Sequence, residues 1–248
     1  MNRLFIMGTV WLLCITSTSG QVRFGVQGGV QAATVYSSVD LSSLTTLGKV
    51  TIPIGERTGF RGGIMADIPL SANWSVRPQL LYSTKGGNAN VVQFATDLIT
   101  KLGLSGSIDP KQLGNSLNSA VVINYLELPV QITYGLPAGP GKVLIGAGPY
   151  IAGATGGTIN DKPITFDTGN FNKWDFGAIG SVGYELNMGF SVSAYYSYGL
   201  LNYSKRSSLN LASLNPNNVS TLDPSSFGGT LYNRAYGVSI GYLLPSRR

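Results

Sequence analysis

Residues 125–134 read Tyr125-Leu126-Glu127-Leu128-Pro129-Val130-Gln131-Ile132-Thr133-Tyr134, with an apolar side chain at every second position from Leu126 onward. Successive side chains of a β-strand point to opposite faces of a sheet. One face of this segment is therefore apolar, and the other carries Glu127 and Gln131. The stretch predicts a strand that separates an apolar environment from a polar one.

The same period of two recurs along the chain and predicts eight strands. Each is close to the length of about 9–11 tilted residues with which a strand crosses a bilayer. The fifth strand is rich in glycine, and its alternation is less clear. The predicted strands are Val22–Tyr36, Arg57–Leu70, Trp74–Tyr82, Val121–Tyr134, Lys142–Gly153, Trp174–Leu186, Phe190–Tyr198 and Leu231–Leu244.

The connections between these strands alternate between short and long. The short ones are Pro69–Asn73, Pro137–Gly141 and Asn187–Gly189, and the long ones are Ser37–Glu56, Ser83–Ala120, Thr155–Lys173 and Gly199–Thr230. Bacterial outer-membrane barrels have short periplasmic turns and longer extracellular loops. The pattern predicts an all-β fold, an eight-stranded antiparallel up-and-down transmembrane β-barrel.

Composition distinguishes this barrel from a soluble one. Charged residues make up 11% of the chain and glycine contributes 33 of 248 residues, whereas soluble domains average about 25% charged residues. A soluble lipocalin-like barrel or sandwich would also alternate, but it would bury its apolar face. An eight-stranded barrel has an interior just wide enough for side chains to fill. The sparse, polar and glycine-rich face suits that interior, and the bulky apolar face suits lipid.

The first 20 residues have the features of a secretory signal peptide. Arg3 precedes the apolar stretch Leu4–Ile15, and the small residues Thr18 and Gly20 stand at the positions that a signal peptidase requires for a cut before Gln21. Cys14 lies inside the apolar stretch, so we interpret it as part of the signal. We expect residues 21–248 to form the barrel domain in the outer membrane after export through the inner membrane.

The chain resembles the PorT-like outer-membrane β-barrel family over nearly all of the expected mature region. The resemblance implies an eight-stranded outer-membrane barrel, and for the members that name the family it implies a part in type IX protein secretion. The segments that carry it are Gly59-Phe60-Arg61-Gly62-Gly63, Ala66-Asp67-Ile68-Pro69-Leu70, Arg77-Pro78-Gln79-Leu80-Leu81-Tyr82-Ser83-Thr84-Lys85-Gly86, Tyr125-Leu126-Glu127-Leu128-Pro129, Gly146-Ala147-Gly148-Pro149-Tyr150, Asp175-Phe176-Gly177 and Tyr196-Ser197-Tyr198-Gly199-Leu200.

The residue types argue against an enzyme. The chain has no histidine, and the small barrel enzymes that act on lipids or proteins use histidine as a base or proton carrier. Cys/His metal sites are excluded on the same ground, and no cofactor motif is present. Lysine and arginine exceed acidic residues by six, but they are scattered, so no basic surface for nucleic acid is predicted.

The polar face carries charges of both signs, which should pair inside a narrow lumen because an unpaired buried ion is costly. One interpretation is a gate or ion path, and the other, which we favour, is a static plug of salt bridges. The residues predicted to form this lumen ionic network are Arg23, Arg61, Asp67, Arg77, Glu127, Asp175 and Glu185.

The connection Ser83–Ala120 contains a segment with helical spacing, in which Val91, Phe94, Leu98 and Leu102 share one face. This segment is predicted either to receive a partner protein or to cover the barrel mouth. Three functions follow as hypotheses: a non-catalytic module that presents loops to secretion components or surface ligands, a small passive channel, and a purely structural barrel. The expected partners are outer-membrane lipid and, through the extracellular loops, other membrane or secretion proteins. Nucleic acid is not expected as a partner.

Overall fold

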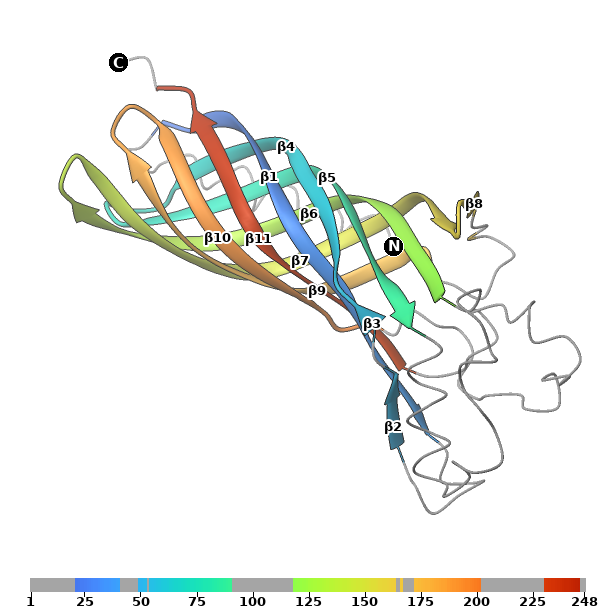
Figure 1. Cartoon of the computed structure of the whole chain (residues 1–248). Helices are drawn as coiled ribbons and strands as arrows, with labels where there is room; N and C mark the ends of the chain where they lie inside the picture. The colour runs from blue at the N-terminus through green and yellow to red at the C-terminus, as the bar shows by residue number, and fades with distance from the viewer. Residues whose placement is uncertain are drawn as a thin grey trace, which may run out of the picture.

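The computed structural model describes residues 21–40, 49–52, 54–90, 118–163, 166, 172–201 and 230–245, which form an antiparallel sheet closed into a barrel (Figure 1). Each long strand pairs with the next, and β11 pairs with β1 from Gly25 opposite Leu243 to Ser38 opposite Thr230. The predicted eight-stranded barrel is confirmed. Its wall consists of β1 (Arg23–Asp40), β4 (Arg57–Pro69), β5 (Trp74–Asn90), β6 (Asn118–Ala138), β7 (Gly141–Ile159), β9 (Trp174–Leu186), β10 (Phe190–Gly199) and β11 (Thr230–Leu243).

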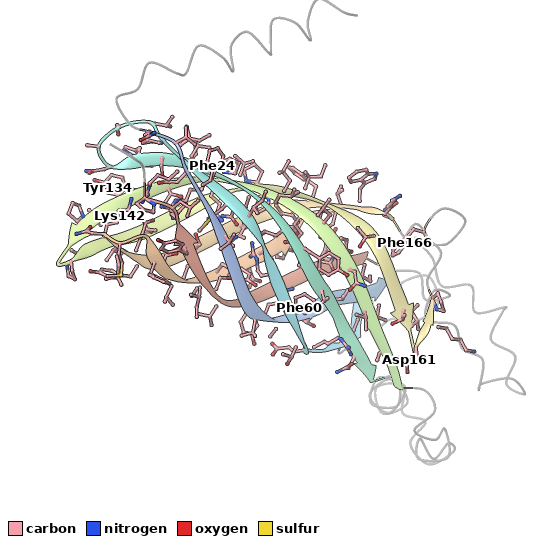
Figure 2. All side chains as sticks on the ribbon, turned by 90° about the horizontal axis from the view of Figure 1, so that it is seen from above. Phe24, Phe60, Tyr134, Lys142, Asp161 and Phe166 are labelled. Carbon is pink, nitrogen blue, oxygen red and sulfur yellow. The ribbon has the colours of Figure 1, made fainter. Side chains whose placement is uncertain are left out.

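Short turns join the strands at one end of the barrel, which we call the turn end, and the opposite end is the loop end. Gly139 and Gly189 occupy these turns with positive φ values of 56° and 96°, a conformation that favours glycine. Figure 2 places Tyr134 and Lys142 near the turn end and Asp161 and Phe166 near the loop end. The short connections therefore lie together, as the sequence predicts.

The strands run further toward the loop end than the alternation predicts. β5 continues to Asn90 instead of ending at Tyr82, and β6 begins at Asn118, so that Gly86 to Asn90 pair with residues 118–122. Backbone hydrogen bonds hold this extension, and they do not require alternating side chains. The predicted loop boundaries at Ser83 and Ala120 are therefore wrong.

Three short strands also lie at the loop end. β2 (Lys49–Ile52) forms a hairpin with the end of β1, β3 (Ile54–Gly55) pairs with β5, and β8 (Lys162–Pro163) pairs with β7. They occupy parts of the connections Ser37–Glu56 and Thr155–Lys173, which were expected to be loops throughout. The loop end thus carries hairpins that extend the barrel wall.

The outer surface of the barrel is apolar. Phe24, Val30 and Ile240 are each more than half exposed, at 63%, 61% and 63%. Aromatic pairs lie at both ends of this surface: Trp74 with Tyr134 at the turn end, and Tyr198 with Tyr232 toward the loop end. A soluble barrel would bury such side chains, whereas a lipid-facing band with aromatic girdles exposes them. The soluble alternative is therefore excluded.

Within the described part of the chain, no helix is long and apolar enough to cross a membrane.

Candidate functional site in the barrel lumen

At the turn end, two arginines and two carboxylates form a cluster in which each arginine contacts both carboxylates; Asp67, Arg77 and Glu185 are buried, and Arg23 is partly exposed. Arg77 Nε lies 2.7 Å from Asp67 Oδ1, and Arg77 Nη2 lies 2.5 Å from Glu185 Oε2. Arg23 Nη1 lies 2.8 Å from Glu185 Oε1, and its other terminal nitrogen pairs with Asp67. Lys142 Nζ adds a longer contact of 3.4 Å to Glu185. We call these five residues the turn-end cluster.

The register of the sheet explains why the members of this cluster meet. Arg23 stands opposite Asp67 on β1 and β4, and Lys142 stands opposite Glu185 on β7 and β9. Arg77, on β5, reaches across the lumen to Glu185. The cluster therefore joins opposite walls of the barrel, and it braces the wall strands against each other.

Arg61 lies in the middle of the lumen and makes no ion pair with a described carboxylate. Its guanidinium carbon sits 4.0 Å from the centre of the Tyr195 ring, and one terminal nitrogen makes a long hydrogen bond of 3.5 Å to Gln79. Tyr195 donates its own hydroxyl proton to Gln31 at 2.8 Å. The structure thus places Arg61 among amides and an aromatic ring, where it interacts electrostatically with Glu127 without an ion-pair contact.

Toward the loop end, Glu127 pairs with Lys85, a residue that the sequence prediction missed. Lys85 Nζ lies 2.6 Å from Glu127 Oε1, which also accepts a 2.7 Å hydrogen bond from Ser83. Lys85 is 2% exposed, and its ammonium group lies 4.7 Å from the centre of the Tyr150 ring. This ion pair is therefore enclosed by the barrel, and aromatic rings cover it.

Asp175 is held by hydrogen bonds and makes no ion pair with a described cation. Tyr150 donates its hydroxyl proton to Asp175 at 3.0 Å, and Asn233 donates an amide proton at the same distance. Asn233 also donates to the Tyr125 hydroxyl at 3.2 Å. The predicted residues thus fall into two ionic groups, with Arg61 and Asp175 outside both.

Apolar and aromatic side chains fill the rest of the lumen on the loop-end side. The members of this buried cluster are Ile123, Tyr125, Tyr150, Ala152, Ala154, Ile179 and Tyr195. Between it and the turn-end cluster lies a polar cavity of about 40 Å³. Because a water molecule needs about 10–15 Å³ by this measure, the cavity holds only a few small species.

Two predicted segments lie outside the described residues. They are the signal peptide 1–20 and the proposed partner-binding residues Val91, Phe94, Leu98 and Leu102. In the part that the structure does describe, no group of three histidine, cysteine or acidic residues could hold a metal ion.

Comparison with known proteins gives a family match over most of the chain. The family described as "Outer membrane protein beta-barrel domain" matches residues 16–205. A search of curated proteins finds no match.

Solved outer-membrane proteins are similar to the chain at low identity. OprG of Pseudomonas aeruginosa has a TM-score of 0.45 at 13% identity, covering 90% of this chain and 96% of its own. Neisserial surface protein A has a TM-score of 0.43 at 12% identity, covering 90% and 99%. Ail of Yersinia pestis has a TM-score of 0.37 at 8% identity, covering 91% and 100%.

Proposed function

Because the chain belongs to the outer membrane protein β-barrel domain family, we propose that it is a non-catalytic outer-membrane barrel whose filled lumen braces the wall and whose loop end presents binding surfaces. A barrel of this family lies in the outer membrane with lipid around its apolar face. The observation that carries the proposal is the turn-end cluster, in which Arg23 and Arg77 each contact both Asp67 and Glu185. We interpret this cluster as a fixed brace.

The ion pairs inside the lumen favour a closed, structural lumen over a passive channel. An ion that crosses the lumen would have to pass the turn-end cluster and then the pair formed by Lys85 and Glu127. Separating buried, hydrogen-bonded charges leaves each of them unpaired in a medium of low polarity, which is strongly unfavourable. The apolar cluster around Tyr125 and Tyr150 occupies the space beyond them.

Single-channel recording tests the closed lumen. We expect the purified protein to give no steady open conductance in planar bilayers. The variant Arg77→Ala/Glu185→Ala/Tyr125→Ala/Tyr150→Ala should leak, because it removes the side chains that reach across the turn end of the lumen and the aromatic side chains that fill its loop-end side. Glu56→Gln changes an exposed carboxylate near the loop end and should behave as the native protein. A steady conductance of the native protein would contradict the proposal and favour the channel hypothesis.

A non-catalytic role is supported by how the lumen carboxylates are used. Glu127 is occupied by Lys85 and Ser83, and Asp175 is occupied by Tyr150 and Asn233. Neither carboxylate is therefore placed as a free acid or base, and the chain has no histidine to replace them. The proposal accordingly assigns the function to binding.

The loop end is the proposed binding surface. Short turns of outer-membrane barrels face the periplasm and long loops face outward, so the hairpins of β2 and β8 point away from the cell. We propose that Val91, Phe94, Leu98 and Leu102 form the docking face for a partner. The resemblance to the PorT-like family makes a secretion component the first candidate. Removal of residues 1–20 as a signal peptide belongs to the same proposal.

Crosslinking in native outer membranes tests the docking face. The variant Val91→Ser/Phe94→Ser/Leu98→Ser/Leu102→Ser keeps the chain length and removes the apolar residues. We expect the tagged native protein to retain a stoichiometric partner and this variant to lose it, without a rise in permeability. A rise in permeability with no loss of partner would instead assign the segment to a lid, and a native barrel without any partner would contradict the docking proposal.

A further inference from the structure

The cavity in the middle of the lumen is lined by hydrogen-bonding side chains from strands all around the barrel, together with the apolar side chains of Met65, Leu144 and Ile179. Gln27, Gln79 and Gln131 contribute amides, and Ser191 and Ser239 contribute hydroxyl groups. Its volume is about 40 Å³. A site of this size and polarity suits water or a small ion, because larger ligands cannot enter and apolar ones would leave the lining unsatisfied.

Two buried polar groups that line this cavity have no hydrogen-bond partner among the described residues. They are Arg61 Nε and Ser239 Oγ. Both residues are only 4% exposed. Buried donors are almost always satisfied in folded proteins, because an unmet donor costs free energy. A hydrogen-bond acceptor inside the cavity would satisfy both groups, because Arg61 Nε donates and the Ser239 hydroxyl can donate as well as accept.

The charges of the lumen indicate which species this is. Arg23 and Arg77 are balanced by Asp67 and Glu185, and Lys85 is paired with Glu127. Arg61 makes no ion-pair contact with a described carboxylate; it interacts with Glu127 only at longer range, and Lys85 and Ser83 already contact that carboxylate.

The remaining predicted lumen carboxylate makes no ion-pair contact with Arg61. Asp175 is bound by Tyr150 and Asn233 instead. The ring of Tyr195 covers one face of the guanidinium. This cation–π contact is attractive, but the ring has no net negative charge to balance the guanidinium.

We propose that the central cavity binds a small monovalent inorganic anion, chloride under ordinary salt conditions, through Arg61 Nε and Ser239 Oγ. The anion accepts the two unmet hydrogen bonds and neutralises Arg61. It acts as a removable counter-ion in the wall-to-wall packing of the lumen, so barrel stability depends on the kind of salt present.

The test compares anions at equal ionic strength. The complete barrel in detergent micelles is unfolded with urea in sodium chloride or in sodium gluconate, whose anion is too large for the cavity. An anion whose dissociation constant is about tenfold below its concentration lowers the unfolding equilibrium constant roughly tenfold. We therefore expect a higher unfolding midpoint in chloride. Equal midpoints in the two salts would overturn the proposal.

Matched variants connect the effect to the site. Arg61→Gln should abolish the difference between chloride and gluconate. Arg57→Gln, on the same strand but outside the cavity lining, should retain it. Ser239→Ala should reduce the difference, whereas Ser197→Ala, whose hydroxyl contacts a backbone carbonyl, should keep it. Retention of the full difference in both Arg61→Gln and Ser239→Ala would overturn the proposal.

A direct measurement does not depend on the folding of any variant. Crystals of the native barrel grown in sodium bromide should show an anomalous peak within hydrogen-bond distance of Arg61 Nε and Ser239 Oγ. A cavity that contains only water under these conditions would overturn the proposal.

Discussion

Replacing Glu185 by Gln is expected to lower the free energy of unfolding of the barrel by about 3–5 kcal/mol, the usual cost of removing one partner from a buried ion pair. Glu185 contacts Arg23, Arg77 and Lys142 at once, and it is 2% exposed. The amide keeps the shape of the side chain but removes its charge. Both arginines are then left with only Asp67 as a buried acidic partner. Urea unfolding of the barrel in lipid vesicles measures the loss.

The control for this prediction is Glu56→Gln, which changes a carboxylate whose contact with Tyr236 is exposed. Exposed interactions of this kind contribute less than about 1 kcal/mol. A double-mutant cycle with Arg77→Gln isolates the contact across the lumen, and residues in one network show coupling of about 0.5–3 kcal/mol. If Glu185→Gln were as mild as the control and the coupling were zero, the turn-end cluster would not be a brace.

Replacing Val238 by Arg should destabilise the barrel by about 2–4 kcal/mol, the cost of an arginine at the middle of the lipid-facing band. Val238 is half exposed on the outer face of β11, between Tyr232 and Tyr242 along the strand. In lipid, its exposed surface contacts acyl chains rather than water. The measurement is again urea unfolding in vesicles.

Ala72→Arg provides the comparison, because Ala72 is exposed in the turn between β4 and β5, outside the strands. A position outside the bilayer should tolerate the charge within about 0.5 kcal/mol. Equal costs at positions 72 and 238 would mean that β11 does not face lipid, which would contradict the orientation of the whole barrel.

Alternation predicted the strands well wherever one face meets lipid. Phe24, Val30 and Ile64 all point outward as their spacing indicates. The prediction failed at the loop end, where Gly86, Gly87 and Asn88 pair with β6 although they show no apolar alternation. Beyond the lipid, both faces of a strand meet polar surroundings or other loops, so the side-chain pattern disappears while the backbone pairing continues.

The sequence predicted most of the charged residues that face the lumen, but it did not predict which of them contact each other. The two-residue period of the strands placed Arg77 and Glu185 on the inward face. They are 108 residues apart in the sequence, however, and only barrel closure and strand tilt bring them together. Lys85 was missed because it fell in a predicted loop. Its position was nevertheless visible, because Arg77, Gln79, Ser83 and Lys85 all share the same phase along β5.

The pairing of β1 with β11 has a consequence for how the barrel assembles. The strands that close the wall come from opposite ends of the chain, with Gly25 opposite Leu243. Pairing between such distant residues is slow, because the intervening chain must first be ordered. Until β11 arrives, the sheet has two open edges that can pair with other chains. A chain truncated before Thr230 should therefore aggregate or remain bound to chaperones, because its sheet cannot close.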